Sequence, residues 1–183
     1  MARRSPANSD ADAATAEWPS TGHDHDLCVN DALARAEAVC DIQGVRLTDI
    51  RRQVLELLWK EHRPRGAYDI LNELATQGRK TAPLTVYRAL DFLVANGLAH
   101  RVESLNAFIG CTQPERRHAT QFLVCTQCGA TTELTDSGLQ AAIQAAADTA
   151  RFTVTRPVIE LQGLCPVCRD AAPDDTHQIG SPS

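Results

Sequence analysis

Two pairs of cysteines, each with two residues between its members, constrain this chain more than any other feature. They are Cys125 with Cys128, and Cys165 with Cys168. Such a pair can direct two thiolates into one tetrahedral metal site, and Gly129 lets the first turn close. Together the pairs would complete a closed four-thiolate zinc site that clips distant strands around a small subdomain. The alternative is two surface disulfides or a redox pair, but two such pairs in a short chain without a secretion signal favour zinc.

A second, mixed set of candidate metal ligands surrounds the first cysteine pair: His100, Cys111, His118 and Glu133. Nitrogen, sulfur and oxygen donors in this combination suit tetrahedral zinc better than calcium or magnesium. Spacing alone does not prove the site. Each residue also has a structural explanation, such as Cys111 serving as a small buried apolar side chain.

Length and composition bound the class of protein. The chain of 183 residues can form one large or two small domains. No stretch approaches 18 consecutive apolar residues, and the N-terminus lacks the apolar core of a signal peptide. Seven cysteines in that context indicate metal ligation in a reducing, cytoplasmic environment. We therefore expect a cytoplasmic protein without a membrane partner.

Charge is distributed unevenly along the chain. The formal net charge is −5, which by itself argues against nucleic acid. Residues 46–101, however, carry ten basic and six acidic side chains, whereas residues 105–183 are acidic overall. A local basic excess beside an acidic half is typical of a DNA-binding face joined to a regulatory domain.

The first half of the chain predicts a winged helix-turn-helix domain over residues 28–103, after a disordered tail at 1–27. Apolar periodicity and stop residues indicate four helices, over about 28–41, 48–62, 68–78 and 83–96. Two short strands follow, at 98–102 and 107–111, joined by a turn. In the fourth helix, Thr85 and Arg88 lie opposite the apolar stripe near the N-terminus, where a recognition helix contacts base edges. A separate cluster in the tail could bind a further metal ion: His23, His25 and Cys28.

The second half predicts a small α/β domain over residues 104–172, so the whole chain falls in the α+β class. Strands are expected at 121–125 and 131–135, a helix at 137–147, and β-rich segments at 153–155 and 158–161. A domain of this size depends on its metal clip for stability. Residues 173–183 return to a composition typical of disorder.

Three blocks of sequence resemble the ferric uptake regulator family, in particular its zinc uptake regulator branch, over about residues 28–172. The first is Arg46-Leu47-Thr48 with Arg51 and Arg52, the second is Thr85-Val86-Tyr87-Arg88-Ala89-Leu90, and the third is the two cysteine pairs. The resemblance implies a homodimeric, metal-dependent repressor that is not an enzyme. It implies zinc as the cofactor at two sites, a structural one and a sensing one.

The resemblance also implies roles for individual residues. The four paired cysteines fall on the family's structural zinc site, and the mixed set falls on its sensing site at the hinge between the domains. Tyr87 and Arg88 fall on major-groove contacts, and Arg46 sits where a basic residue can enter the minor groove. Iron and peroxide sensors of the family usually carry a histidine-rich run where this chain has Glu115-Arg116-Arg117-His118. The thiolate of Cys111 instead favours zinc.

The expected mechanism is a population shift at the hinge. Zinc would be fully coordinated only in one relative orientation of the domains, and it would thereby select the dimer that binds a pseudo-palindromic operator in front of zinc-uptake genes. Three alternatives are an iron or peroxide sensor, a zinc-buffering protein, and a zinc enzyme with Glu133 as general base.

Overall fold

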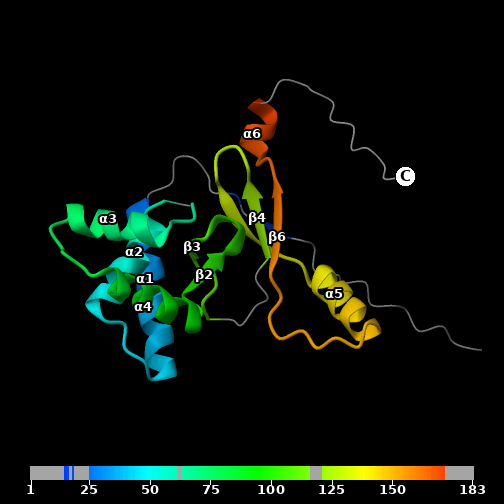
Figure 1. The fold of residues 1–183 in the computed structure, drawn as a ribbon, viewed down its shortest axis with the longest axis horizontal. Helices are drawn as coiled ribbons and strands as arrows, with labels where there is room; N and C mark the ends of the chain where they lie inside the picture. The colour runs from blue at the N-terminus through cyan, green and yellow to red at the C-terminus, as the bar shows by residue number, and fades with distance from the viewer. Residues whose placement is uncertain (1–14, 17, 19–24, 62, 116–120, 172–183) are drawn as a thin grey trace, which may run out of the picture.

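The computed structural model describes residues 15–16, 18, 25–61, 63–115 and 121–171, in a helical half and a half built on a sheet (Figure 1). The helical half contains α1 (His25–Gln43), α2 (Asp49–Trp59), α3 (Ala67–Thr76), α4 (Pro83–Ala95), β2 (Ala99–Val102), the 3-10 turn η1 (Glu103–Leu105) and β3 (Ala107–Gly110). The second half contains β4 (Gln121–Cys125), β5 (Thr131–Thr135), α5 (Ser137–Thr149), β6 (Ile159–Gly163) and α6 (Pro166–Ala171), with the short strand β1 (Thr15–Ala16) added to its sheet. The α+β class and the winged helix-turn-helix architecture are confirmed.

The four helices of the first half form because each carries an apolar stripe at helical spacing. In α2 the stripe is fully buried: Val54, Leu55, Leu57 and Leu58. Thr48 takes the N-cap position with an extended backbone, as expected, although its side chain makes no capping hydrogen bond. All four helices contribute to one core, which also receives Ala99 of β2 and Phe108 of β3.

The boundaries of α4 follow from local chemistry. Pro83 occupies the first turn, where its missing N–H costs no hydrogen bond. The helix ends at Ala95, and Gly97 then takes a positive φ of 71° that a side chain would disfavour. These limits agree with the prediction and fix which side chains of α4 face outward.

The wing is the hairpin of β2 and β3, in which His100 pairs with Ile109. Two backbone hydrogen bonds between Phe108 and Arg65, of 2.8 and 2.9 Å, connect β3 to the segment before α3. The turn between the strands is η1 followed by Asn106 in the left-handed region. These hydrogen bonds attach the wing to the helical core, and the turn of the wing faces the sheet.

The sheet of the second half has the strand order β1-β5-β4-β6. Strand β4 pairs antiparallel with β5 and parallel with β6. The connection from β5 to β6 therefore passes β4 in the sheet, and it contains α5. Strands β4 and β5 have the predicted limits. Among the described residues, the apolar clusters at this half are small: Phe122 and Val124 pack with Val102 of the wing, and Trp18 and Ala130 pack with the cysteines at the far end. Such a small core agrees with a domain that needs a metal clip.

Several elements differ from the expectations. The β-rich residues 153–155 lie in an irregular segment, and β6 begins only at Ile159. The helix α6 was not predicted. Within the segment expected to be a disordered tail, Thr15–Ala16 pairs with β5, and α1 begins at His25 rather than at Cys28. The short strand forms because tertiary pairing overrides weak local propensity. Residues 173–183 lie outside the described residues. Among the described helices, none is long and apolar enough to cross a membrane.

Candidate metal centres and nucleic-acid interface

The four paired cysteines converge at one end of the sheet. Cys125 ends β4, Cys128 lies in the turn closed by Gly129 at a positive φ of 73°, Cys165 follows β6, and Cys168 lies in α6. Their sulfur atoms all lie within 4.8 Å of one another, and the Sγ atoms of Cys128 and Cys165 are 3.8 Å apart. Zinc–sulfur bonds of about 2.3 Å in a tetrahedron place the sulfurs about 3.8 Å apart. All four cysteines are free, which argues against the disulfide alternative.

Backbone N–H groups in this cluster stabilise the thiolate form of Cys125. The N–H of Cys165 donates to the sulfur of Cys125 at 3.3 Å. Burial opposes ionisation of Cys125, but hydrogen bonds from the backbone at Cys128, Cys165 and Gln127 lower the pKa of its thiol to about 6. Burial and hydrogen bonds to the neighbouring sulfurs raise the pKa of Cys168 instead. A cation is therefore needed to hold all four sulfurs as thiolates, and four thiolate donors in this arrangement fit zinc.

A second cluster lies at the junction of the two halves. It comprises His100 of β2, Cys111 just after β3, and Glu133 of β5, with one ligand atom from each within 4.8 Å of the others. His100 Nε2 lies 3.1 Å from Glu133 Oε1. The helical half and its hairpin supply the nitrogen and the sulfur, and the sheet supplies the carboxylate. The three donors fit tetrahedral zinc with one position left for a further ligand.

The surroundings of this hinge cluster orient its carboxylate and bury its thiol. Thr112 donates from Oγ1 to Glu133 Oε2 at 2.6 Å, and the ring of His100 packs edge-on against Phe122 at 5.9 Å. Burial, with the nearby charge of Glu133, raises the pKa of Cys111 to about 12. Without a cation this thiol therefore stays protonated, whereas a bound metal would favour the thiolate.

The structure describes only some of the residues expected as ligands in the hinge set and in the tail cluster. His118, expected as the fourth hinge ligand, lies outside the described residues. In the tail, His23 also lies outside the described part of the chain, and Cys28 is a half-buried free thiol in α1. The ligand role of His118 and the tail cluster therefore stay predictions.

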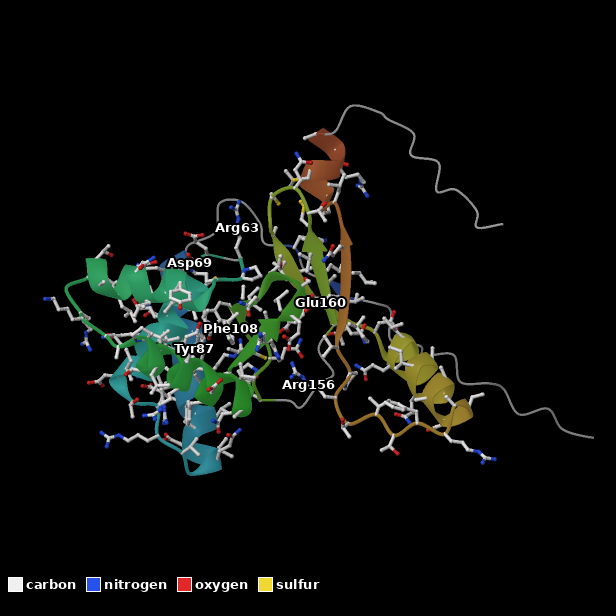
Figure 2. The ribbon with its side chains drawn as sticks, in the orientation of Figure 1. Arg63, Asp69, Tyr87, Phe108, Arg156 and Glu160 are labelled. Carbon is white, nitrogen blue, oxygen red and sulfur yellow. The ribbon has the colours of Figure 1, made fainter. Side chains whose placement is uncertain are left out.

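The expected DNA-contacting residues gather on the outer side of the helical half. Thr85, Tyr87 and Arg88 are exposed on α4, whereas Val86, Ala89 and Leu90 are buried. Figure 2 shows Tyr87 on this helix. Arg46 is exposed before α2, and its carbonyl accepts a hydrogen bond of 2.6 Å from Arg51. This arrangement presents polar and basic side chains on a rigid helix, as base and phosphate contacts require.

Sequence reasoning did not find several residues at these sites. Arg35 of α1 reaches the hinge, where its Nε donates to Glu115 at 2.7 Å and its Nη2 donates to the carbonyl of Thr112. The burial of Arg35 opposes the charge, but the hydrogen bond to Glu115 is the larger effect and raises its pKa. Trp18 packs against the four-cysteine cluster. None of these residues lies in a spacing motif, so only the pairing of distant segments reveals them.

Comparisons with known proteins match this chain to one family. Residues 42–162 match the ferric uptake regulator family. The chain is 38% identical over 141 residues to the zinc uptake regulation protein of Escherichia coli (strain K12), covering 75% of this chain and 81% of the relative. It is 32% identical over 128 residues to the zinc uptake regulation protein of Mycobacterium tuberculosis (strain CDC 1551 / Oshkosh), covering 69% and 96%.

Solved structures resemble the fold over a similar length. A zinc uptake regulator complexed with zinc and DNA has a TM-score of 0.74 and 35% identity, covering 78% of this chain and 96% of that chain. The holo form of XcZur has a TM-score of 0.72 and 38% identity, covering 77% and 99%. The match therefore spans both halves of the molecule, including the hinge between them.

Proposed function

The chain belongs to the ferric uptake regulator family, and on that premise we propose that it is a zinc-responsive transcriptional repressor controlling zinc-uptake genes in the cytoplasm. Two relatives that are 38% and 32% identical are named zinc uptake regulation proteins. Proteins of this family regulate transcription, so the zinc-enzyme alternative is set aside.

The observation that carries the proposal is the cluster of His100, Cys111 and Glu133. Its ligand atoms lie within 4.8 Å of one another although they come from both halves of the molecule. An ion bound there would couple the position of the recognition helix to that of the sheet. We assign the regulatory zinc to these residues together with His118, and the structural zinc to the four paired cysteines, which gives two ions per chain. The sulfur ligand supports zinc over iron or manganese.

For DNA we assign base and backbone contacts to four exposed residues of the helical half: Arg46, Thr85, Tyr87 and Arg88. In a related structure a zinc uptake regulator binds zinc and DNA together. The outward position of these residues also opposes a protein that only buffers zinc. A two-fold dimer would present two α4 helices to a pseudo-palindrome with half-sites about one helical turn apart.

Apolar surface on the second half supports a homodimer. Large apolar side chains are exposed on and near β6, α5 and α6: Phe152, Val158, Leu161, Leu164 and Val167. Strand β6 ends the sheet on one side, so its outer backbone groups are available to a second chain. Exposed large apolar side chains beside an unpaired strand edge are typical of a protein interface.

A titration of operator binding tests the proposal. Mobility shift of labelled promoter DNA would be measured with zinc, iron, manganese and a chelator, using the full-length protein. We expect specific binding with zinc at the lowest free metal concentration and loss of binding on chelation. Equal response to iron would favour the iron-sensor alternative, and metal-independent binding would exclude a sensing role.

A further inference from the structure

The turn of the wing is attached to the sheet by one carboxylate. Glu160 of β6 accepts hydrogen bonds from the backbone N–H of Glu103 at 2.6 Å and of Ser104 at 2.9 Å, one on each oxygen. The first N–H groups of a helical turn have no partner within the turn, so a carboxylate there forms charge-assisted hydrogen bonds. These two bonds join segments that lie 57 and 56 residues apart in the sequence.

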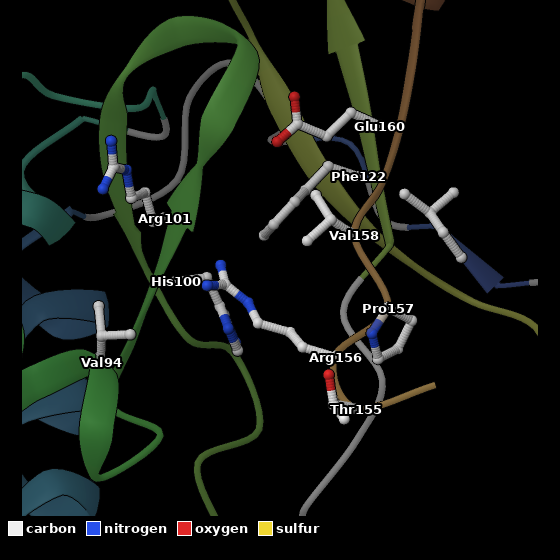
Figure 3. A pocket seen from close by; sticks show the side chains of 10 residues that line it. Val94, His100, Arg101, Phe122, Thr155, Arg156, Pro157, Val158 and Glu160 are labelled. Atoms are coloured by element: carbon white, nitrogen blue, oxygen red, sulfur yellow. The ribbon is translucent and has the colours of Figure 1, made fainter. Parts of the chain in front are cut away.

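An ion pair strengthens the same junction. Arg156, in the segment before β6, donates from Nη2 to Glu103 Oε1 at 2.8 Å, and Arg101 of β2 lies 3.0 Å from Glu103 Oε2. The side chain of Arg156 is 64% exposed, so its pairing contributes less than the two bonds to Glu160. Figures 2 and 3 show Arg156 and Glu160 at the junction between the wing and the sheet.

The register of the sheet relates this junction to the hinge cluster. Phe122 of β4 pairs with Glu133 on one side and with Glu160 on the other, so the three residues form one row across the sheet. Paired side chains share a face, and strands lie about 4.8 Å apart. The backbones of the two glutamates therefore lie about 10 Å apart across the sheet. Glu133 contacts the wing at His100, and Glu160 contacts the wing at its turn. Two separated polar contacts resist rotation of the wing more than either contact alone.

A cavity of about 410 Å³ lies between the end of α4, the wing and β6 (Figure 3), lined by Val94, His100, Phe122, Arg156, Pro157 and Glu160. Apolar packing of Val102 against Phe122 and Val124 also joins the wing to the sheet, but the cavity leaves this packing incomplete on the side of Glu160. The polar contacts of Glu160 hold the orientation there, and none of them involves a metal ligand atom.

We propose that Glu160 is a positioning residue, supported by Arg156, that latches the wing to β6 and so favours the DNA-competent orientation before the regulatory zinc binds. The inference rests on the proposed function, because it assigns a role within the same zinc switch. Burial alone would raise the pKa of Glu160, but its hydrogen bonds with Ser104 and Glu103 lower it, so the carboxylate is ionised at neutral pH. Removing the latch lowers the fraction of closed protein, and by linkage it lowers the affinity for zinc.

The test measures zinc affinity without DNA. Full-length wild-type protein, Glu160→Ala and the isosteric Glu160→Gln would each be loaded at the four-cysteine site and titrated with zinc against a fluorescent chelator. The control is Asp148→Ala, which removes an exposed carboxylate that accepts a hydrogen bond from Gln144 within α5. We expect Glu160→Ala to weaken the more labile zinc by roughly tenfold, within the usual range of allosteric coupling, with a smaller change for Glu160→Gln and none for the control.

A second measurement reads the orientation itself. Small-angle X-ray scattering of the protein without the labile zinc should show a broader distribution of dimensions for Glu160→Ala than for wild type, with the four-cysteine zinc retained. Unchanged zinc affinity together with unchanged scattering in the folded variants would overturn the latch. If Glu160→Ala does not fold, Glu160→Gln decides by the same two readouts. Failure of the wild-type protein to bind operator DNA would count against the proposed function alone, because neither readout includes DNA.

Discussion

At the scale of single residues, backbone amides define the chemistry of the four-cysteine cluster more than side-chain partners do. The N–H of Cys165 donates to Cys125, and the N–H of Cys168 lies 3.5 Å from the sulfur of Cys165. Amides placed in this way stabilise thiolates and fix their directions. Because Cys125, Cys165 and Cys168 are buried, loss of one sulfur cannot be compensated by water.

Cys168→Ser is expected to remove the structural zinc and to lower the free energy of unfolding by several kcal/mol, because metal binding at a closed site is coupled to folding. Zinc content by mass spectrometry and the dimer by size-exclusion chromatography would measure this. The control is Cys28→Ser, which removes a half-buried thiol of α1 outside the four-cysteine site and should keep the structural zinc and the dimer. A normal, zinc-free dimer of Cys168→Ser would disprove the assignment.

Arg88→Ala tests the base contact assigned to α4. Arginine contacts guanine through paired donors, so the substitution should cost about 1–3 kcal/mol at the operator and relax specificity at one base pair. Footprinting on operators with single base changes would reveal it. Arg88 is exposed and the helix buries Val86 and Leu90 instead, so the fold should be unaffected. If Arg88→Ala instead weakened binding equally on all DNA sequences, Arg88 would contact a phosphate rather than a base.

At the scale of elements, local sequence predicted the helical half well and the sheet half only in part. Stripes such as Val54, Leu57 and Leu58, bounded by stop residues, indicate helices whatever their partners are. Strand β1 contains only two residues and depends on pairing with Thr135 and Leu134 of β5, so no local signal could reveal it. Residues 153–155 show the opposite case: their side chains are β-branched, but no strand among the described residues pairs with them.

The candidate sites divide in the same way. Cysteine spacing predicted the four-thiolate cluster, because a short spacing constrains the geometry directly. The hinge set needed the family resemblance, since the sequence does not show that Glu133 faces His100 across two halves. Glu160 and Thr112 had no signal at all. A carboxylate that accepts hydrogen bonds from backbone N–H groups requires no particular residue type in the partner segment. The sequence of that segment therefore gives no pattern that predicts the contact.

Strand β1 has a predicted consequence for the four-cysteine site. Its antiparallel register carries the chain toward the start of β5, where Trp18 packs against the cluster beside Ala130. Trp18→Ala should expose the sulfurs and speed zinc transfer to a colorimetric chelator several-fold. Tyr68→Ala, at an exposed aromatic of α3, is the control. Equal rates for the two variants would show that Trp18 does not shield the metal.

Gly110 couples the wing to α2. A side chain there would place a Cβ within 2.8 Å of three atoms of the Trp59 indole. Gly110→Ala should therefore lower the free energy of unfolding by about 1–3 kcal/mol. It should also displace the adjacent Cys111 and weaken the regulatory zinc. Thermal unfolding and zinc competition would measure the two effects, with the exposed Gly163 changed to Ala as the control because nothing lies within 4 Å of a Cβ there. A stable variant with normal zinc affinity would contradict this coupling.

At the scale of the whole molecule, the two proposed zinc sites have different mechanical roles. The four-cysteine site joins β4, the following turn and α6, all within the sheet half. The hinge cluster joins the wing to β5, and Arg35 extends the junction to α1. One metal would therefore hold a domain together, and the other would orient two domains against each other.

The difference between the sites predicts two steps of zinc loss. Four thiolates make a tight, slowly exchanging site, whereas a site with imidazole and carboxylate ligands from both halves should release its ion first. We expect two zinc ions per chain, with mild chelation removing one. The singly loaded protein should stay a folded dimer but lose specific operator binding, and added zinc should restore it. Metal analysis, light scattering and mobility shift on one sample would follow the three properties together.

Two substitutions should reproduce the chelated state permanently. Cys111→Ser and His118→Ala each remove one proposed hinge ligand and leave the four cysteines intact, so the dimer and one zinc should persist while zinc-dependent repression is lost. A reporter gene behind the operator, measured under zinc limitation and repletion, reads this directly. If either variant behaves like the wild type, with repression under zinc repletion and relief under zinc limitation, the hinge is not the sensor. Zinc would then control repression without joining the wing to the sheet.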